Sequence, residues 1–145
     1  MKILVCVSNV PDTTTKISFS PDNTQFNTAG VQYIINPYDE LALTKALELN
    51  EAAGGGSVTV VHAGLADAEP NLRKALAVGA DDAVRIDVQP ADGFQVAAEI
   101  AAYAKDKGFD LILCGRESID YNSGIVPGML AEFLDWPQAN VITSI

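Results

Sequence analysis

Short apolar runs and longer amphipathic segments alternate along this chain. The apolar runs predict buried parallel strands, because a strand that is covered on both faces reads as a continuous apolar run. The predicted strands are Lys2–Val7, Ser57–Ala63, Ala83–Val88 and Leu111–Cys114. Apolar residues at helical spacing predict helices over Pro37–Ala53, around Leu72, Ala75 and Leu76, over Gly93–Lys107 and over Asn122–Leu134. The alternation predicts a three-layer α/β domain with four parallel strands and right-handed crossovers.

The start of the first helix carries several independent signals. Asn36 is a capping residue type, Pro37 suits the first helical position, and Asp39 and Glu40 put negative charge where the helix dipole favours it. Three glycines at 54–56 end the helix. Its expected apolar face consists of Leu41, Ala42, Ala46, Leu47 and Leu49.

A polar, threonine-rich passage from Asp12 to Gly30 interrupts the alternation. Turn-forming residues at 21–23 predict a minor hairpin in which Lys16–Ser20 pairs with Val31–Ile35. This passage is the long loop of the predicted domain.

The most informative local feature is the end of the last predicted strand. An apolar run stops at Gly115, where glycine permits a close approach of the backbone, and polar residues that start a helix follow. Ligands of open α/β sheets bind at the carboxyl ends of the strands. If Lys2–Val7 is central in the sheet, its end and that of Leu111–Cys114 flank the point where a nucleotide would lie.

The residues before the last helix allow two interpretations. Backbone N–H groups from Asn122 onward, the Ser123 hydroxyl and the small Gly124 would form an anion cradle at a helix N-terminus. In the other interpretation, Asp120, Asn122 and Ser123 only cap the helix. Local chemistry does not choose between the two.

Composition and charge narrow the function classes. The 145 residues, 48% of them hydrophobic, are enough for one globular domain. The net charge of −10 argues against nucleic acid or an anionic membrane as the main partner, because both require a basic surface. No apolar run approaches a membrane span and the N-terminus does not resemble a signal peptide, so a cytoplasmic location is expected.

The inventory of reactive side chains is small. Cys6 and Cys114 lie in apolar strand runs, which favours reduced core packing over a redox role. His62 lies inside a predicted strand without a partner nucleophile or ligand set, which favours a structural role. The chain lacks Gly-x-Ser-x-Gly, the dinucleotide fingerprint Gly-x-Gly-x-x-Gly and the phosphate-binding loop motif Gly-x-x-x-x-Gly-Lys-Ser/Thr. We therefore expect no catalytic residues and no metal site.

Five segments of the chain are informative together: Lys2–Ile17, Asn36–Glu40, Leu76–Asp81, Gly115–Asp120 and Phe133–Gln138. They resemble the electron transfer flavoprotein β subunits and occur in the order expected for that family. The resemblance implies a Rossmann-like adenine-nucleotide-binding fold, similar to that of the adenine nucleotide α hydrolases. It also implies a heterodimeric electron carrier whose α subunit holds most of the redox FAD.

The resemblance further implies the ligand and the electron partners. The β-subunit site would hold AMP, or the adenylate half of a second FAD in electron-bifurcating relatives. Electrons would pass from dehydrogenases, such as acyl-CoA dehydrogenases, to a quinone oxidoreductase or another acceptor, with no substrate chemistry in this subunit. By position, the nucleotide contacts would fall on Cys6, Asn36, Pro37, Tyr38, Asp39, Ala63, Gly115, Arg116, Ser118, Ile119, Asp120, Asn122, Ser123, Gly124 and Val126.

The chain departs from the family pattern at several positions. Ile125 stands where the family usually has Gln, and Thr13 stands where some members have an aromatic residue near the flavin. Pro127 lacks an N–H group, which is dispensable only if the last helix begins late, near Val126. The family continues well beyond Val141–Ile145, a strand-like segment, so we expect an N-terminal portion that self-associates through surface meant for the α subunit.

Two other classes remain open at this stage. A stand-alone nucleotide-binding module of the universal stress protein type shares the layered architecture, although its Gly-x-x-Gly loop is missing here. A hydrolase or transferase would use Asp120 with Cys114 or His62, but a thiolate nucleophile needs a base and an electropositive setting.

Overall fold

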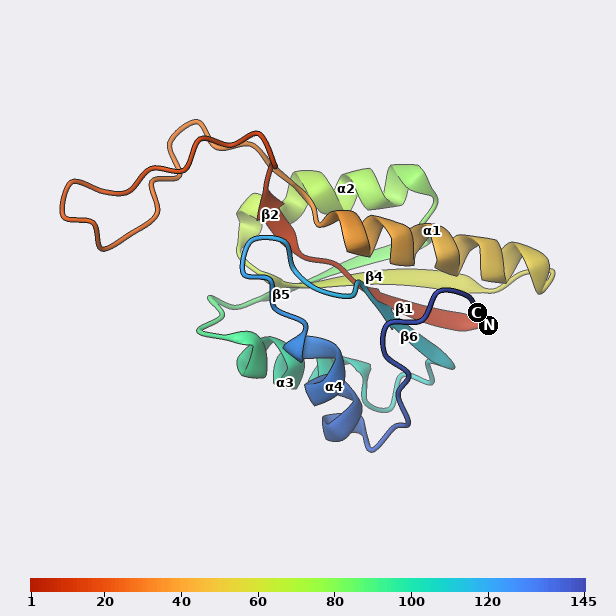
Figure 1. Ribbon diagram of the computed structural model, residues 1–145. Coiled ribbons are helices and arrows are strands. Elements are labelled where there is room, and N and C mark those ends of the chain that lie inside the picture. Colours follow the sequence, from red (N-terminus) through yellow and green to blue (C-terminus); the bar gives the residue numbers. More distant parts are fainter.

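A parallel four-stranded sheet forms the centre of the molecule, as the computed structural model of residues 1–145 shows (Figure 1). The strands are β1 (Lys2–Cys6), β4 (Ser57–Gly64), β5 (Asp82–Asp87) and β6 (Leu111–Cys114), in the spatial order β5-β4-β1-β6. All strand pairs are parallel, which confirms the predicted strands and their direction.

Helices cover both faces of this sheet. They are α1 (Pro37–Ala52), α2 (Glu69–Val78, after a short 3₁₀ turn at Ala66–Ala68), α3 (Gly93–Ala104) and α4 (Ile125–Leu134). Helices α1 and α2 lie on one face, and α3 and α4 lie on the other (Figure 1). Two apolar clusters, one on each side of the sheet, hold the layers together. The three-layer α/β architecture is confirmed.

The order of the strands creates a switch point between β1 and β6. The chain moves outward from β1 through β4 to β5, and α3 then carries it back to the other side of β1. The carboxyl ends of β1 and β6 therefore lie side by side, with Cys6 and Cys114 as register partners. This is the place where ligands bind in open α/β sheets.

Several predicted helix details are wrong. Helix α4 begins at Ile125 rather than Asn122, because Asn122 has φ of 50°, outside the right-handed helical region. Helix α3 ends at Ala104, before the left-handed residues Asp106 and Gly108. Leu41 is 66% exposed, whereas Leu43, which was not predicted, is buried toward the sheet together with the predicted Ala46. Leu76 of α2 is likewise exposed.

The hairpin predicted in the long loop pairs differently. Short strands β2 (Asn9–Pro11) and β3 (Tyr33–Ile35) form an antiparallel pair at its base. Between them, residues 12–32 form an arm that projects from the sheet and contains a single bridge, Phe19 to Phe26 (Figure 1). The Lys16–Ser20 segment therefore does not pair with Val31–Ile35.

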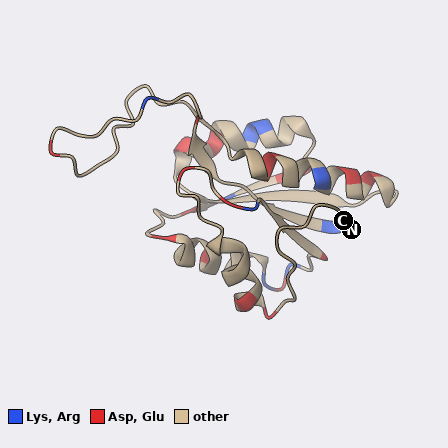
Figure 2. Cartoon of the chain, in the orientation of Figure 1, with Lys and Arg blue, Asp and Glu red and all other residues tan.

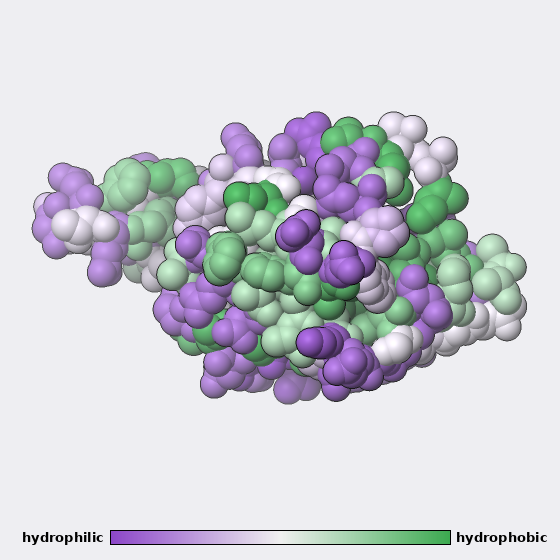
Figure 3. All heavy atoms as spheres, turned by 90° about the horizontal axis from the view of Figure 1, so that it is seen from below, coloured by the Kyte–Doolittle hydropathy of each residue, from purple (hydrophilic) through white to green (hydrophobic).

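The surface combines scattered charge with one apolar region. The few Lys and Arg residues are dispersed and form no basic patch (Figure 2). On the side of α3 and α4, apolar side chains gather at the surface (Figure 3). They include exposed Phe94 and Phe133, whose rings meet edge to face with centroids 5.2 Å apart.

The C-terminal segment and the helices bear on two further expectations, a last strand and the absence of a membrane span. The Val141–Ile145 segment is exposed and forms no strand. None of the helices has the length and apolar character that a membrane crossing requires.

Candidate functional site

Two cysteine side chains, the buried Cys6 and the partly exposed Cys114, lie at the switch point. Cys6 ends β1, Cys114 ends β6, and both are free thiols. A hydrogen bond with Cys114 and burial both raise the pKa of Cys6 well above its ordinary value. Cys6 therefore packs as a neutral thiol beside Cys114 on the α3/α4 side of the sheet.

Asn36 connects the start of α1 to the loop after β6. Its side chain is buried, its Nδ2 donates to the carbonyl oxygen of Glu117 at 2.8 Å, and its Oδ1 accepts from the backbone N–H of Ile119 at 3.3 Å. Asn36 is the N-cap residue by position, but its side chain makes no capping hydrogen bond. The expected local cap is thus replaced by a contact between segments about 80 residues apart in the sequence.

Asp39 joins the ends of β1 and β6. One carboxylate oxygen accepts from the backbone N–H of Ser8 at 2.7 Å, and the other accepts from the backbone N–H of Gly115 at 3.0 Å. Burial raises the pKa of Asp39 from its ordinary 3.8 to about 6, against the lowering effect of these hydrogen bonds. A Cβ atom on Gly115 would lie 2.2 Å from Asp39 Oδ1 and 2.8 Å from the Tyr38 backbone. The close approach predicted at Gly115 is therefore confirmed.

The loop between β6 and α4 is closed by its own hydrogen bonds. Ser118 and Ser123 form an antiparallel bridge, with the Ser118 N–H donating to the Ser123 carbonyl at 2.9 Å. The Ser118 hydroxyl donates to the Asp120 carboxylate, which also accepts from the backbone N–H of Tyr121 at 2.9 Å. Partial burial raises the pKa of Asp120. The loop is a compact turn held by hydrogen bonds among its own residues.

No side chain caps the N-terminus of α4. Gly124 occupies the N-cap position, and none of the three residues proposed as caps reaches the helix. The capping interpretation of Asp120, Asn122 and Ser123 is therefore wrong. Pro127, at the third helical position, has no N–H, whereas the N–H groups of Ile125 and Val126 lack an intrahelical acceptor. The late start that Pro127 requires is confirmed, since the helix begins at Ile125.

One cation lies beside this loop. The Arg116 guanidinium contacts the Glu117 carboxylate at 2.6 Å and lies 5.4 Å from the centre of the Tyr38 ring. The Arg116 side chain is half exposed and is paired with Glu117.

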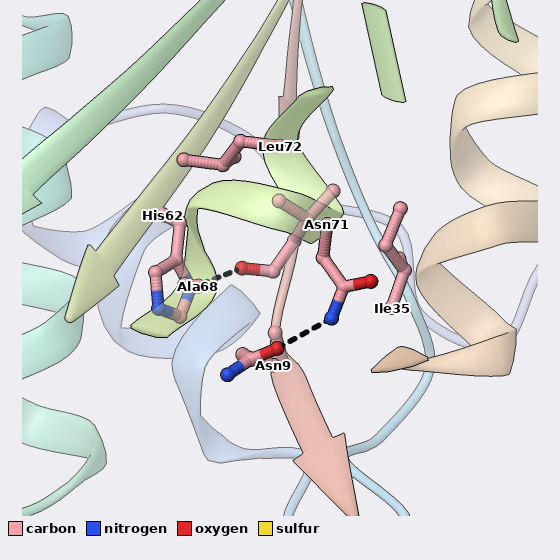
Figure 4. Close-up of a pocket in the computed structure, with 8 residues that line it drawn as sticks. Asn9, Ile35, His62, Ala68, Asn71 and Leu72 are labelled. Atoms are coloured by element: carbon pink, nitrogen blue, oxygen red, sulfur yellow. Dashed lines mark hydrogen bonds between the residues drawn. The ribbon is translucent and has the colours of Figure 1, made fainter. Parts of the chain in front are cut away.

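A small cavity lies at the same edge but on the α1/α2 side (Figure 4). His62 Nδ1 lies 2.9 Å from the Val7 carbonyl oxygen, and Asn71 Nδ2 donates to Asn9 Oδ1 at 2.6 Å. Burial lowers the pKa of His62, so the ring is neutral at pH 7 and holds the strand end. Ala63, the next residue, is buried with Cys6 on the opposite side of the sheet. None of the predicted nucleotide contacts lines the cavity, although Ser8, whose N–H donates to Asp39, does.

Comparison with known proteins decides the family. A model of the electron transfer flavoprotein domain matches residues 23–145. The electron transfer flavoprotein subunit beta of Bacillus subtilis is 40% identical over 149 residues, and that of Homo sapiens is 35% identical over 150 residues, each covering the whole chain. The chain belongs to the electron transfer flavoprotein family.

The match to the electron transfer flavoprotein family covers only part of the relatives. This chain spans 57% of the Bacillus subtilis protein and 59% of the human protein. A further relative is the acryloyl-CoA reductase electron transfer subunit gamma of Anaerotignum propionicum, 40% identical over 95% of this chain and 53% of its own length. Membership in the family sets aside the stress-protein and hydrolase alternatives.

The structure brings several of the predicted site residues together through connections that the sequence did not predict. Cys6, Cys114 and Gly115 come together at the switch point, and Asn36 and Asp39 contact the loop that carries Ser118 to Gly124. Ser8 was not predicted, and neither was the role of the Asn36 and Asp39 side chains as partners of protein backbone. The signal available in the sequence was an acid in the first turn of a helix, together with a glycine at the end of a later strand.

Proposed function

We propose that this chain is the nucleotide-binding part of an electron transfer flavoprotein β subunit and that it binds AMP at the switch point between β1 and β6. The names of the aligned relatives support the electron-transfer role. The site residues stay a prediction, and the geometry of the loop after β6 is what supports them.

The uncapped N-terminus of α4 is the observation that carries this proposal. The N–H groups of Ile125 and Val126 are available to a phosphate, and the helix dipole favours negative charge there. Gly124 packs closely against the Arg116 backbone, since a Cβ there would lie 2.9 Å from the Arg116 carbonyl oxygen, and Ser123 precedes it with a hydroxyl. These donors fit a phosphate, and Arg116 adds the neighbouring positive charge.

The α1 start contributes differently from the family expectation. The side chains of Asn36 and Asp39 are already bonded to protein backbone, so contacts with a nucleotide from this segment would come from the backbone and from Tyr38. Ile125, which replaces the usual Gln, lies against Gly93 at the start of α3, and its apolar side chain offers no hydrogen bond to a phosphate.

We further propose a flavin-bearing α subunit as the partner, with FAD held mainly by that subunit, or as a second FAD in the AMP position of a bifurcating complex. Bound FAD would supply the redox chemistry, while this chain orients the assembly and binds the adenylate group. Acyl-CoA or other dehydrogenases would donate the electrons, and a quinone oxidoreductase or another acceptor would receive them. The name of the Anaerotignum propionicum relative supports an acyl-CoA-linked donor or acceptor. The two free cysteines support a reducing, cytoplasmic location.

The proposal is tested by identifying what the purified chain carries. The protein is denatured, and the released small molecules are measured by mass spectrometry and absorbance, with and without a candidate α subunit. Near-stoichiometric AMP is the expected result, whereas FAD in its place identifies a bifurcating relative. The absence of both, in the chain alone and in the complex, contradicts nucleotide binding.

A further inference from the structure

We propose that Asp39 is a positioning residue: its ionised carboxylate ties the end of β1 to the first residue of the β6–α4 loop and so preforms the loop for phosphate. This inference rests on the proposed nucleotide site. It assigns the side chain a protein partner rather than a ligand contact.

The carboxylate acts where the sheet stops. Cys6 and Cys114 are the last register partners of β1 and β6, and the backbone pairing between these strands ends with them. Ser8 and Gly115 follow, and each donates its N–H to a different oxygen of Asp39. The carboxylate thereby replaces a rung of the sheet at the point where the strands separate.

The start of the loop packs closely against the first turn of α1. A Cβ atom on Gly115 would overlap Asp39 Oδ1 at 2.2 Å, so the backbone of the loop touches the carboxylate directly. Asn36, on the same helical turn, holds Glu117 and Ile119 farther along the loop. The first turn of α1 therefore sets the position of the loop from Gly115 to Ile119.

Only the ionised form satisfies both donors. A carboxylate accepts at both oxygens, whereas a protonated carboxyl group or an Asn amide carries its own donor, which would oppose one of the two N–H groups. The pKa of Asp39, about 6, puts this change between pH 5 and 7. Cys6 on β1, hydrogen-bonded to Cys114 on β6, interacts electrostatically with Asp39, and Arg116, which follows Gly115 in the loop, is paired with Glu117.

Asp81 offers a matched control. Its carboxylate accepts from the backbone N–H of Val58 at 2.7 Å. This is the same kind of contact, but it lies at the start of β4, at the amino end of the parallel strands. Asp81→Asn and Asp39→Asn therefore each weaken a carboxylate–backbone contact, but only Asp39→Asn does so at the proposed site.

The first test needs no variant and no ligand. Amide chemical shifts of the ¹⁵N-labelled chain are followed from pH 4.5 to 8. Ser8 and Gly115 are expected to titrate together with a midpoint near pH 6, because one carboxylate binds both. This transition should persist in Asp81→Asn and vanish in Asp39→Asn. The absence of a shared transition in the unmodified chain overturns the inference.

The second test measures AMP binding by calorimetry at pH 7.5 and pH 5. Asp39→Asn is expected to bind AMP about tenfold more weakly than the unmodified chain at pH 7.5, the effect of one lost charge-assisted hydrogen bond. The phosphate of AMP also gains a proton near pH 6, which affects binding to every variant. Protonation of Asp39 is therefore recognised by an additional loss of AMP affinity below pH 6 in the unmodified chain and in Asp81→Asn. Equal affinity of Asp39→Asn and the unmodified chain overturns the inference.

The two proposals fail in different ways. If no variant binds AMP but the Ser8 and Gly115 amides titrate together, the nucleotide proposal fails and Asp39 still positions the loop. If AMP binds with an affinity that depends on neither Asp39 nor its ionisation, the nucleotide proposal stands and this inference fails.

Discussion

At the scale of single residues, the buried carboxylate of Asp39 positions the loop but lowers the stability of the fold. Asp39 is almost fully buried, and burial raises its pKa to about 6, so the native protein binds a proton more tightly there than the unfolded chain does. The contribution of Asp39 to the free energy of unfolding is therefore largest at low pH and decreases as pH rises through 6. Loop geometry and overall stability thus respond to acid in opposite directions.

This opposition gives a prediction for unfolding. The change in the pKa of Asp39 from 3.8 to about 6 corresponds to about 3 kcal/mol of stability lost between pH 4 and pH 7, to order of magnitude. Asp39→Asn should lack this component of the pH dependence, whereas Asp81→Asn should keep it. Urea unfolding at several pH values measures the difference, and parallel curves for the unmodified chain and Asp39→Asn would count against it.

Glycine at the strand end gives a second prediction. Gly115→Ala should lower the free energy of unfolding by about 1–3 kcal/mol, because the new methyl group overlaps Asp39 and the Tyr38 backbone. Gly128→Ala in α4 is the matched control, since its Cβ would meet only Gln138 at 3.7 Å. Helix propensity predicts that Gly128→Ala gains about 0.5–1 kcal/mol. Thermal or urea unfolding of both variants decides, and equal effects would contradict the close-packing argument.

At the scale of elements, the N-terminus of α4 combines a favourable dipole with an unused set of donors. The helix lacks a side-chain cap, and Pro127 removes one N–H, so the remaining N–H groups are concentrated at Ile125 and Val126. A negative side chain placed beside them would compete with a bound phosphate.

Ser123→Glu tests this competition. The introduced carboxylate should abolish AMP binding through repulsion of the phosphate, while it changes stability by no more than about 1 kcal/mol. Ser123→Gln has nearly the same size without the charge and should retain more affinity. Calorimetry with AMP provides the comparison. Unchanged affinity in Ser123→Glu would remove the phosphate from this helix end.

At the scale of the whole molecule, the arm of residues 12–32 is separate from the layered core. Its strand pair β2–β3 closes the base, while Ile17 and Phe19 on the arm are about 60% exposed. The arm stands away from the sheet in Figure 1, so the core does not depend on its tip.

Shortening the arm should therefore spare the fold. Replacing residues 16–29 by a short Asn-Gly turn should change the free energy of unfolding by less than about 1 kcal/mol, because loop-closure entropy varies slowly with loop length. Urea unfolding and circular dichroism measure this. A variant that fails to fold would show that the arm supports the core.

The sequence alone predicted the elements that depend on local patterns. Continuous apolar runs identified all four parallel strands, and helical spacing with Pro37 and the three glycines located α1. The switch point between β1 and β6 was predicted on the condition that Lys2–Val7 is central in the sheet, and the strand order confirms that condition. These features repeat over a few residues, so they can be read without knowledge of the fold.

Only the tertiary structure decided how the site is held. Asn36 and Asp39 were predicted as helix-start residues and potential ligand contacts, yet their side chains bond to backbone as far as 83 residues away. The left-handed Asn122 and the pairing of β2 with β3 were also beyond local patterns. The physical reason is that a buried polar group needs a hydrogen-bond partner, and the fold supplies that partner from a segment far away in the sequence. Local sequence patterns do not identify such a distant partner.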